Sequence, residues 1–505
     1  MKKLMYWFVM VVIAFVTCFG VAGCGGADRK LPGWVDGKKN LIFYIFDEVP
    51  FYQSVAQRFN QLEGNEDVNV VILKSGTTYF DDLILSYAGA QTPDIVFMQM
   101  GDILPFLNGR NILLEPLDEY LAESEVLKES DLWPANDGYR YNEQTKNLDS
   151  TSKSNKLYSI IKDFSPDFPL TYNKAAMLAA TSYNSEDETL PTVSTETGET
   201  VQISKKTIRD KLNAAMENGY PAEIPAGGSA LDYTLTWDEY NALALAMKNL
   251  GASSGAVLDG APELQILQWI EMSGETLFDE DNNCRDIKNT PGIRKAFDNF
   301  RILQERQNSA APWVNGSQPG YAQFRDGLEK LSSGTASTFY GRWAYSQFGW
   351  DQSLDKIGYC APPLPADYEA GNLSSAIGGA MGLSITSKCQ YKEEAWDFIE
   401  FFMTTIQQEE AAKGFNISGN RTIANEYFAN AEGSAEYKAL NSFYFNLSQN
   451  SQTLHQNPYI SQSKLKSIMW YHFEGYFYGT STASWETVLD NIRNEINTEI
   501  AKARA

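Results

Sequence analysis

The chain has 505 residues, with 41 Lys and Arg against 64 Asp and Glu, and its formal net charge at pH 7 is −23. Such an acidic balance disfavours binding to a phosphate backbone and so argues against a nucleic-acid function. The sequence contains only two histidines, which excludes an HExxH zinc motif and leaves few candidates for a histidine general base.

The N-terminal segment predicts export. Two lysines precede a mostly apolar stretch, and the small residues Val21-Ala22-Gly23 precede Cys24. This pattern predicts a signal peptide over residues 1–23 rather than a spanning helix. The cysteine in this position resembles the lipobox of bacterial lipoproteins, which implies acylation of Cys24 and a membrane anchor. Residues 24–37 then form a glycine-rich, polar tether.

The first domain begins with a strand–helix–strand–helix–strand pattern. Apolar runs predict strands over residues 40–46, 68–73 and 93–98, and helical spacing of apolar residues predicts helices over 51–62 and 80–87. Such a unit predicts a mainly parallel sheet with right-handed crossovers.

Polar residues follow the predicted strands. Asp47 and Glu48 follow the first strand, and residues 99–102 follow the third. Ligands of parallel sheets bind beyond the carboxyl ends of the strands. The sequence therefore predicts a polar crevice at these residues.

The middle of the chain is less regular. Residues 134–156 and 183–206 are rich in Ser, Thr, Asn, Glu and Asp, and we expect them to be surface insertions. Apolar periodicity predicts further helices and two short strands around them. The helices are expected over residues 237–250, 264–272, 292–307 and 395–403 and from Trp485 onward, and the strands over residues 337–340 and 357–359.

Enzyme and metal motifs are weak in this sequence. A GxSxG string at residues 251–255 follows a predicted helix, whereas a nucleophile elbow lies between a strand and a helix. Cys284, Cys360 and Cys389 are widely spaced, which predicts neither a disulfide framework nor a metal cluster. One pair could form a bridge, but the spacing favours buried thiols. We therefore expect no cofactor and no metal. Two carboxyls suffice for glycoside hydrolysis, so a glycosidase remains open as an alternative.

Aromatic residues cluster in the second half of the chain. Sugars pack their C–H faces on aromatic rings, and polar side chains bind their hydroxyls. Arg342 beside Trp343 supplies bidentate donors. These features favour a carbohydrate ligand. The cluster comprises Trp313, Tyr340, Trp343, Tyr345 and Trp350, with Trp269 further upstream.

Six ordered phrases resemble the extracellular solute-binding proteins of the sugar-import type. In such proteins the tryptophan of the Gly-Arg-Trp phrase lines the ligand cleft. The phrases are residues 92–96, 156–161 followed by 171–174, 236–240, 334–336 with 341–343, 376–380 and 394–399.

The resemblance implies two α/β lobes, each with a mainly parallel sheet flanked by helices, that close on ligand by a hinge. The first lobe is expected over residues 38–165 and 377–410, and the second over residues 166–376 and 411–505. The resemblance implies ligand-binding roles for nine residues. They are Asp47, Glu48, Gln99, Asp102, Asp163, Trp269, Tyr340, Arg342 and Trp343.

The predicted function is that of a non-enzymatic, monomeric receptor anchored by lipid on the outer face of the cytoplasmic membrane, as in Gram-positive bacteria. It would deliver a carbohydrate, an oligosaccharide by preference, to an ABC import permease. Two alternatives stay open. One is a surface glycosidase or lyase, and the other is a binding protein for a peptide or another non-sugar solute.

Overall fold

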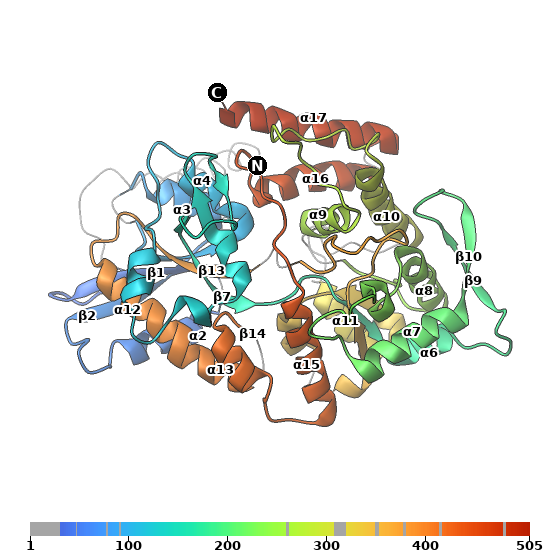
Figure 1. Cartoon of the computed structure of the whole chain (residues 1–505), viewed down its shortest axis with the longest axis horizontal. Helices are drawn as coiled ribbons and strands as arrows, with labels where there is room; N and C mark the ends of the chain where they lie inside the picture. Colours follow the sequence, from blue (N-terminus) through green and yellow to red (C-terminus); the bar gives the residue numbers. More distant parts are fainter. Residues whose placement is uncertain are drawn as a thin grey trace, which may run out of the picture.

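The computed structural model describes residues 31–504, except residues 47, 77–78, 90–91, 259–261, 308–319, 349–352, 377–379, 414–416 and 478–480. The predicted signal peptide, Cys24 and Asp47 lie outside the described residues, as do Trp313 and Trp350. The described chain forms two α/β lobes that lie side by side (Figure 1). Across this described part, no helix is long and apolar enough to cross a membrane.

The first lobe is built on a six-stranded sheet with the order β14-β7-β13-β3-β1-β2. β1 (Lys39–Ile45) pairs in parallel with β2 (Val68–Lys74) and with β3 (Ile95–Gln99). The helices α2 (Val49–Phe59) and α3 (Tyr79–Ser86) connect these strands. The predicted βαβαβ unit is therefore confirmed.

The other half of this sheet is antiparallel, which corrects the expectation of a mainly parallel sheet. β13 (Met381–Ile385) runs antiparallel to β3 and to β7 (Ile160–Phe164), and β14 (Ile417–Ser418) runs antiparallel to β7. The direction follows from the chain path. β7 leads out of the first lobe, whereas β13 re-enters it from the second lobe and so runs the opposite way.

The core of the first lobe continues past residue 410, where the sequence placed the boundary. Ile417 on β14 and Phe428 are fully buried in the same apolar cluster as the sheet. α12 (Lys392–Phe401) covers this sheet, and its Phe398 packs 5.4 Å from Phe43 between ring centroids. α12 continues through a π-helical turn (Phe402–Ile406) into α13 (Gln407–Lys413), which leads to β14.

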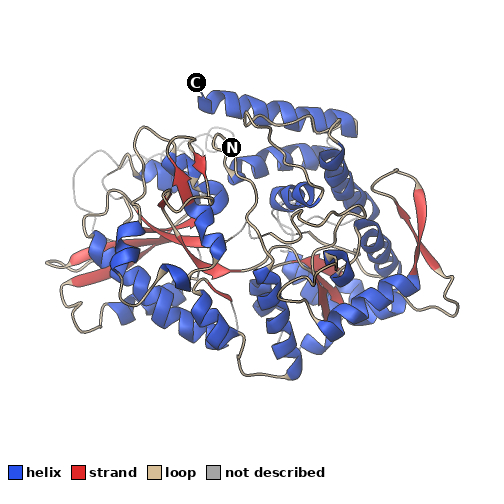
Figure 2. Ribbon diagram, in the orientation of Figure 1, coloured by secondary structure: helices blue, strands red, loops and turns tan. Residues whose placement is uncertain are grey.

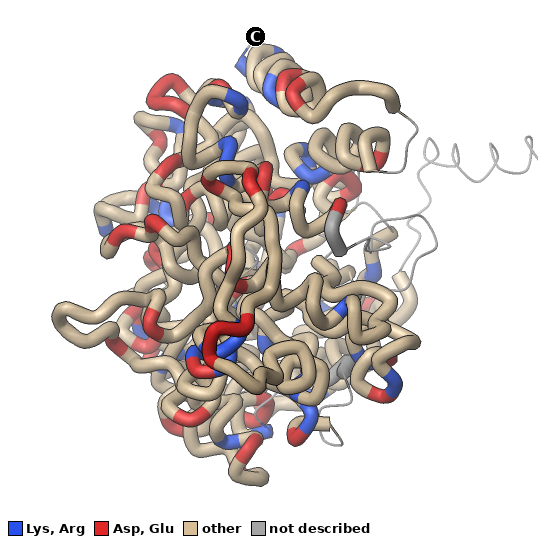
Figure 3. Tube along the Cα trace, turned by 90° about the vertical axis from the view of Figure 1, so that its right-hand side faces the viewer, with Lys and Arg blue, Asp and Glu red and all other residues tan. Residues whose placement is uncertain are grey.

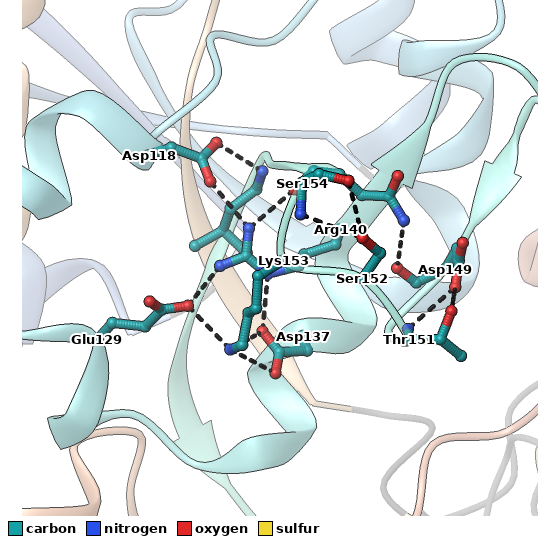
Figure 4. A network of polar contacts seen from close by, with 11 residues as sticks. Asp118, Glu129, Asp137, Arg140, Asp149, Thr151, Ser152, Lys153 and Ser154 are labelled. Carbon is teal, nitrogen blue, oxygen red and sulfur yellow. Dashed lines mark hydrogen bonds and ion pairs between the residues drawn. The ribbon is translucent and has the colours of Figure 1, made fainter.

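Residues 134–156 are anchored in the first lobe rather than forming a loose surface insertion. They include a 3₁₀ helix (Pro134–Tyr139) and most of a small sheet with the order β5-β4-β6. Arg140 is 3 % exposed and forms ion pairs with Asp118, Asp137 and Glu129 at 2.8, 2.8 and 2.6 Å (Figure 4). The polar composition of this segment thus reflects an internal ion network. The strands of its sheet are β4 (Arg140–Asn142), β5 (Asn147–Leu148) and β6 (Lys156–Leu157).

The second lobe encloses a three-stranded antiparallel sheet with the order β11-β8-β12. Residues 183–206 include a hairpin that projects from this lobe (Figure 2). Acidic and basic residues are interspersed on the side of the molecule that Figure 3 shows. The strands are β8 (Leu170–Asn173), β11 (Ser337–Phe339) and β12 (Ile357–Cys360), and the hairpin is β9 (Thr189–Val193) with β10 (Thr200–Ser204).

Helices surround the sheet of the second lobe, and local sequence fixes where some of them begin. Thr236 and Glu239 form a reciprocal capping box at α8, which explains the Thr-Trp-Asp-Glu phrase. Cys284, Cys360 and Cys389 are buried free thiols, as predicted. The helices of the second lobe are α6 (Lys174–Ala180), α7 (Lys205–Asn218), α8 (Trp237–Asn249), α9 (Pro262–Met272), α10 (Pro291–Gln307), α11 (Gly320–Glu329), α15 (Ala435–Gln449), α16 (Gln462–Phe477) and α17 (Trp485–Arg504).

The first lobe has three further short helices. They are α4 (Leu104–Leu107), α5 (Asp118–Glu123) and α14 (Arg421–Ile423).

Candidate functional site

A cleft of about 640 Å³ lies between the two lobes. Its first wall comes from the ends of strands β1, β3, β7 and β13, together with the start of α2. Its second wall comes from residues 165–168 between β7 and β8, from α9 and α11, from the Gly-Arg-Trp loop and from the start of α16. A cleft between two lobes at strand ends is where ligands of α/β proteins bind.

Two half-exposed aromatic rings line the cleft from opposite lobes. Phe46 follows β1 and is 41 % exposed, and Trp343 in the second lobe is 42 % exposed. Phe97 supports Phe46 at a centroid distance of 5.6 Å. Tyr340 and Tyr321 meet the Trp343 ring edge-to-face at 5.5 and 6.3 Å. Each ring is therefore held by other rings while it presents apolar surface to the cleft.

A partly buried ion pair lies at the end of β7, with Lys162 buried and Asp163 partly exposed. The Lys162 ammonium pairs with the Asp163 carboxylate and lies 5.1 Å from the centroid of the Phe97 ring. Burial on its own lowers the pKa of Lys162, but the negative charge of Asp163 outweighs it, and the net pKa is raised. Burial also raises the pKa of the neighbouring Tyr52 to about 12. The Lys162 ammonium therefore stays charged, and the Tyr52 phenol stays neutral, over the physiological pH range.

The backbone of Glu48 is strained where it enters the cleft. Glu48 has a φ of 55° and precedes the first turn of α2. A residue with a side chain costs about 1 kcal/mol or more in this left-handed region, and such strain concentrates at functional sites. Glu48, Gln99, Asp163 and Trp343 are the predicted binding residues that line the cleft.

Four other predicted binding residues lie behind the cleft surface. Asp102 is 2 % exposed, and its Oδ1 accepts a hydrogen bond from the Ser463 backbone N–H. Tyr340 is buried behind the Trp343 ring. Arg342 is 1 % exposed and donates to Asn441 Oδ1 at 3.1 Å. Trp269 packs on Trp237 in the core of the second lobe.

Several cleft residues gave no signal in the sequence analysis. Phe46 was assigned to a buried strand, although its position at the strand end could have marked it. Lys162 directly follows the phrase at residues 156–161 and lies outside every predicted element. Tyr321 and the residues of α16 lie far along the chain from the strand ends and had no local pattern that points to a site. The α16 residues in the cleft are Gln462, Ser463 and Lys466.

Metal ligation is not indicated in the described part of the chain. No group of three or more His, Cys, Asp or Glu side chains there is arranged to hold an ion. The cleft offers aromatic faces, hydrogen-bonding oxygens and an ion pair.

Residues 223–409 match the family model of bacterial extracellular solute-binding proteins. Over this segment, which is less than half of the chain, the sequence is similar to that family. The matched segment includes the Trp343 loop, β13 and α12. The search of curated proteins finds no matching relative.

Solved structures of solute-binding proteins share the fold over most of the chain. An ABC substrate-binding protein from Listeria monocytogenes, in complex with cycloalternan, has a TM-score of 0.64 at 16 % identity, covering 92 % of this chain and 99 % of that one. The GacH receptor of Streptomyces glaucescens, solved with acarbose, has a TM-score of 0.62 at 14 % identity with the same coverage. UgpB from Mycobacterium tuberculosis, in complex with glycerophosphocholine, has a TM-score of 0.61 at 14 % identity, covering 93 % and 100 %.

Proposed function

We propose that the solute-binding protein captures a carbohydrate in its interlobe cleft and delivers it to an ABC import permease without altering it. The observation that carries this proposal is the pair of half-exposed rings, Phe46 and Trp343, on opposite walls. A sugar ring has two apolar C–H faces, so platforms on both walls suit it. In the arrangement of the lobes seen here, both rings line the cleft between them.

The polar residues of the cleft fit the edge of a sugar. Gln99 and the carboxylates of Glu48 and Asp163 line the cleft and offer acceptors for hydroxyl hydrogens. Carboxylates outnumber ammonium groups in the lining, which disfavours an anionic solute through Coulomb repulsion. The lining carboxylates are Glu48, Asp163, Asp167 and Glu263, and the ammonium groups are Lys162 and Lys466.

The solved structures with this fold support a carbohydrate ligand, and one of them shows that the fold also binds another kind of solute. The Listeria protein was solved with cycloalternan and GacH with acarbose. UgpB was solved with glycerophosphocholine. The acidic lining of this cleft favours an uncharged ligand over one that carries a phosphate, and so favours the carbohydrate.

A thermal-melting screen tests the carbohydrate proposal. The soluble chain from residue 25 is melted with mono- and oligosaccharides, with glycerophosphocholine and with peptides. A ligand at about 1,000 times its Kd adds about 4 kcal/mol to the stability of the folded state, which raises Tm by several degrees. A shift with a sugar that is recovered intact supports the proposal. A shift only with glycerophosphocholine or peptides contradicts it, and a cleaved sugar contradicts the transport role.

Variants of the two aromatic residues in the cleft test the observation on which the proposal rests. Phe46→Ala and Trp343→Ala are each expected to weaken sugar binding. The matched control is Tyr471→Ala, because Tyr471 is an aromatic residue of α16 that is 72 % exposed and does not line the cleft. Unchanged affinity in both ring variants would contradict the assignment of the rings as platforms.

The lipid anchor is proposed from sequence. Acylation of Cys24 would hold the monomeric protein on the outer face of the cytoplasmic membrane, close to its permease. Cys24→Ser is expected to release the protein into the medium, and metabolic labelling with a fatty acid is expected to be lost. Retention of the label in that variant would place the acyl group elsewhere.

A further inference from the structure

The start of α16 touches the first lobe, although α16 belongs to the core of the second. Leu465, Ile468 and Phe473 of α16 are buried in the second core. Its first turn lies against the 3₁₀ turn Met100–Asp102, which follows β3 in the first lobe. There the Asp102 Oδ1 accepts a hydrogen bond of 3.0 Å from the Ser463 backbone N–H.

The backbone of the first lobe is shaped for this contact. A Cβ atom on Gly101 would lie 2.1 Å from Gln462 Oε1 and 2.7 Å from Gln462 Cβ, so a side chain at this position would push α16 away. A second hydrogen bond crosses nearby, from Asn108 Nδ2 to the Pro458 carbonyl at 3.0 Å. Two hydrogen bonds therefore join the lobes here, and Gly101 permits their close approach. We call this contact between the Met100–Asp102 turn, Asn108, Pro458 and the start of α16 the seam.

The same turn of α16 lines the cleft. Gln462, Ser463 and Lys466 all belong to the second wall. The first N–H groups of a helix have no partner inside the helix, and a carboxylate there is favoured by both hydrogen bonding and the helix dipole. Asp102 supplies this cap from the opposite lobe and is 2 % exposed, so water competes little for the bond.

We propose that Asp102 is a positioning residue that caps α16 across the seam and so favours the arrangement of the lobes seen in this structure. This inference rests on the proposed function. Any hinge rotation that separates the Met100–Asp102 turn from α16 breaks the bond to Ser463. Asp102 thus acts on affinity through the population of protein in this arrangement, without touching the solute.

The experiment compares three variants by two measurements. Asp102→Ala removes the acceptor, whereas Asp102→Asn keeps an oxygen that can accept the Ser463 N–H bond. The matched control is Ser204→Ala, because Ser204 caps α7 by the same kind of bond to Thr207 within a single lobe. The first measurement is the Kd of the best sugar from the melting screen. The second is the interlobe distance in ligand-free protein, from electron-spin distances between labels at the exposed Glu63 and Asn249.

Asp102→Ala is expected to broaden the distribution of interlobe distances. It is also expected to raise the Kd about tenfold, because the arrangement that binds the sugar becomes a minor population. The Kd of Asp102→Asn is expected to stay within about threefold of the Kd of the unmodified protein. Ser204→Ala is expected to change neither the Kd nor the interlobe distances. An unchanged distance distribution in Asp102→Ala overturns the inference. A Kd that rises equally in both Asp102 variants without a change in distance assigns Asp102 to direct ligand contact instead. If no sugar binds even the unmodified protein, the proposed function fails, while the distances still decide the role of Asp102.

Discussion

Replacing Trp343 by alanine tests how much one ring contributes to binding. An aromatic side chain presents about 250 Å² of surface at most, and Trp343 is 42 % exposed, which leaves about 100 Å² for a ligand to cover. At about 25 cal/mol per Å², full coverage is worth about 2.5 kcal/mol. A ligand that covers two thirds of it gains about 1.7 kcal/mol. Trp343→Ala should therefore weaken binding about 15- to 60-fold.

The assay is isothermal titration of the best sugar from the melting screen. Trp343→Phe serves as the conservative variant, because it keeps a flat ring of smaller area, and we expect about a threefold loss. Trp269→Ala is the contrasting variant. Trp269 is 2 % exposed in the second core, so its removal should cost about 3–5 kcal/mol of folding free energy. The protein that remains folded should bind the sugar normally.

The reasoning is refuted if Trp343→Ala binds the sugar within twofold of the unmodified protein while its Tm is unchanged. It is also refuted if Trp269→Ala, measured under conditions where it is folded, loses affinity as strongly as Trp343→Ala. Either result would mean that exposed ring area in the cleft does not set the affinity.

Two further predictions concern stability. Arg140→Ala leaves three carboxylates without their buried partner and should cost about 3 kcal/mol, whereas Arg58→Ala, at the exposed pair with Glu409, should cost under about 1 kcal/mol in the same urea titration. Equal losses would contradict the structural role of the Arg140 network. Burial raises the pKa of Glu271 from 4.5 to about 8, so the folded protein keeps a proton that the unfolded chain releases. The resulting stability is present below about pH 4.5 and is lost as the pH rises toward 8, and Glu271→Gln should flatten this part of the Tm-against-pH curve. A curve that keeps its slope in that variant would contradict the assignment.

The sequence predicted the first lobe well because its signals are local. Strands such as β1 are apolar runs buried on both faces, and the polar residues that follow them line the cleft. Glu48 and Gln99 could therefore be found without a structure. The directions of β13 and β14 could not be predicted from the sequence, because the direction of a strand depends on the lobe from which the chain enters the sheet.

The segment around Arg140 shows where composition misleads. Residues 134–156 contain the charged and polar residues expected of a solvated loop. In the structure Asp137 and Lys153 pair within this segment, and Arg140 reaches Asp118 and Glu129 outside it. A buried charge that is satisfied by its neighbours has the same composition as an exposed one. Only the partners distinguish the two cases.

Trp269 and Trp343 show the same limit for aromatic residues. Both are tryptophans near other rings, and both are predicted to bind ligand. Their exposures, 2 % and 42 %, distinguish a residue of the second core from one whose ring faces the cleft. Asp102 is a third case, since its partner Ser463 is 361 residues away in the chain. The strand-end rule predicts Asp102 as a binding residue, but in the structure Asp102 is buried behind the cleft surface and accepts a hydrogen bond from Ser463. Ser463 belongs to a helix whose position depends on the whole second lobe. A local rule can therefore locate the crevice but cannot assign each residue its contact.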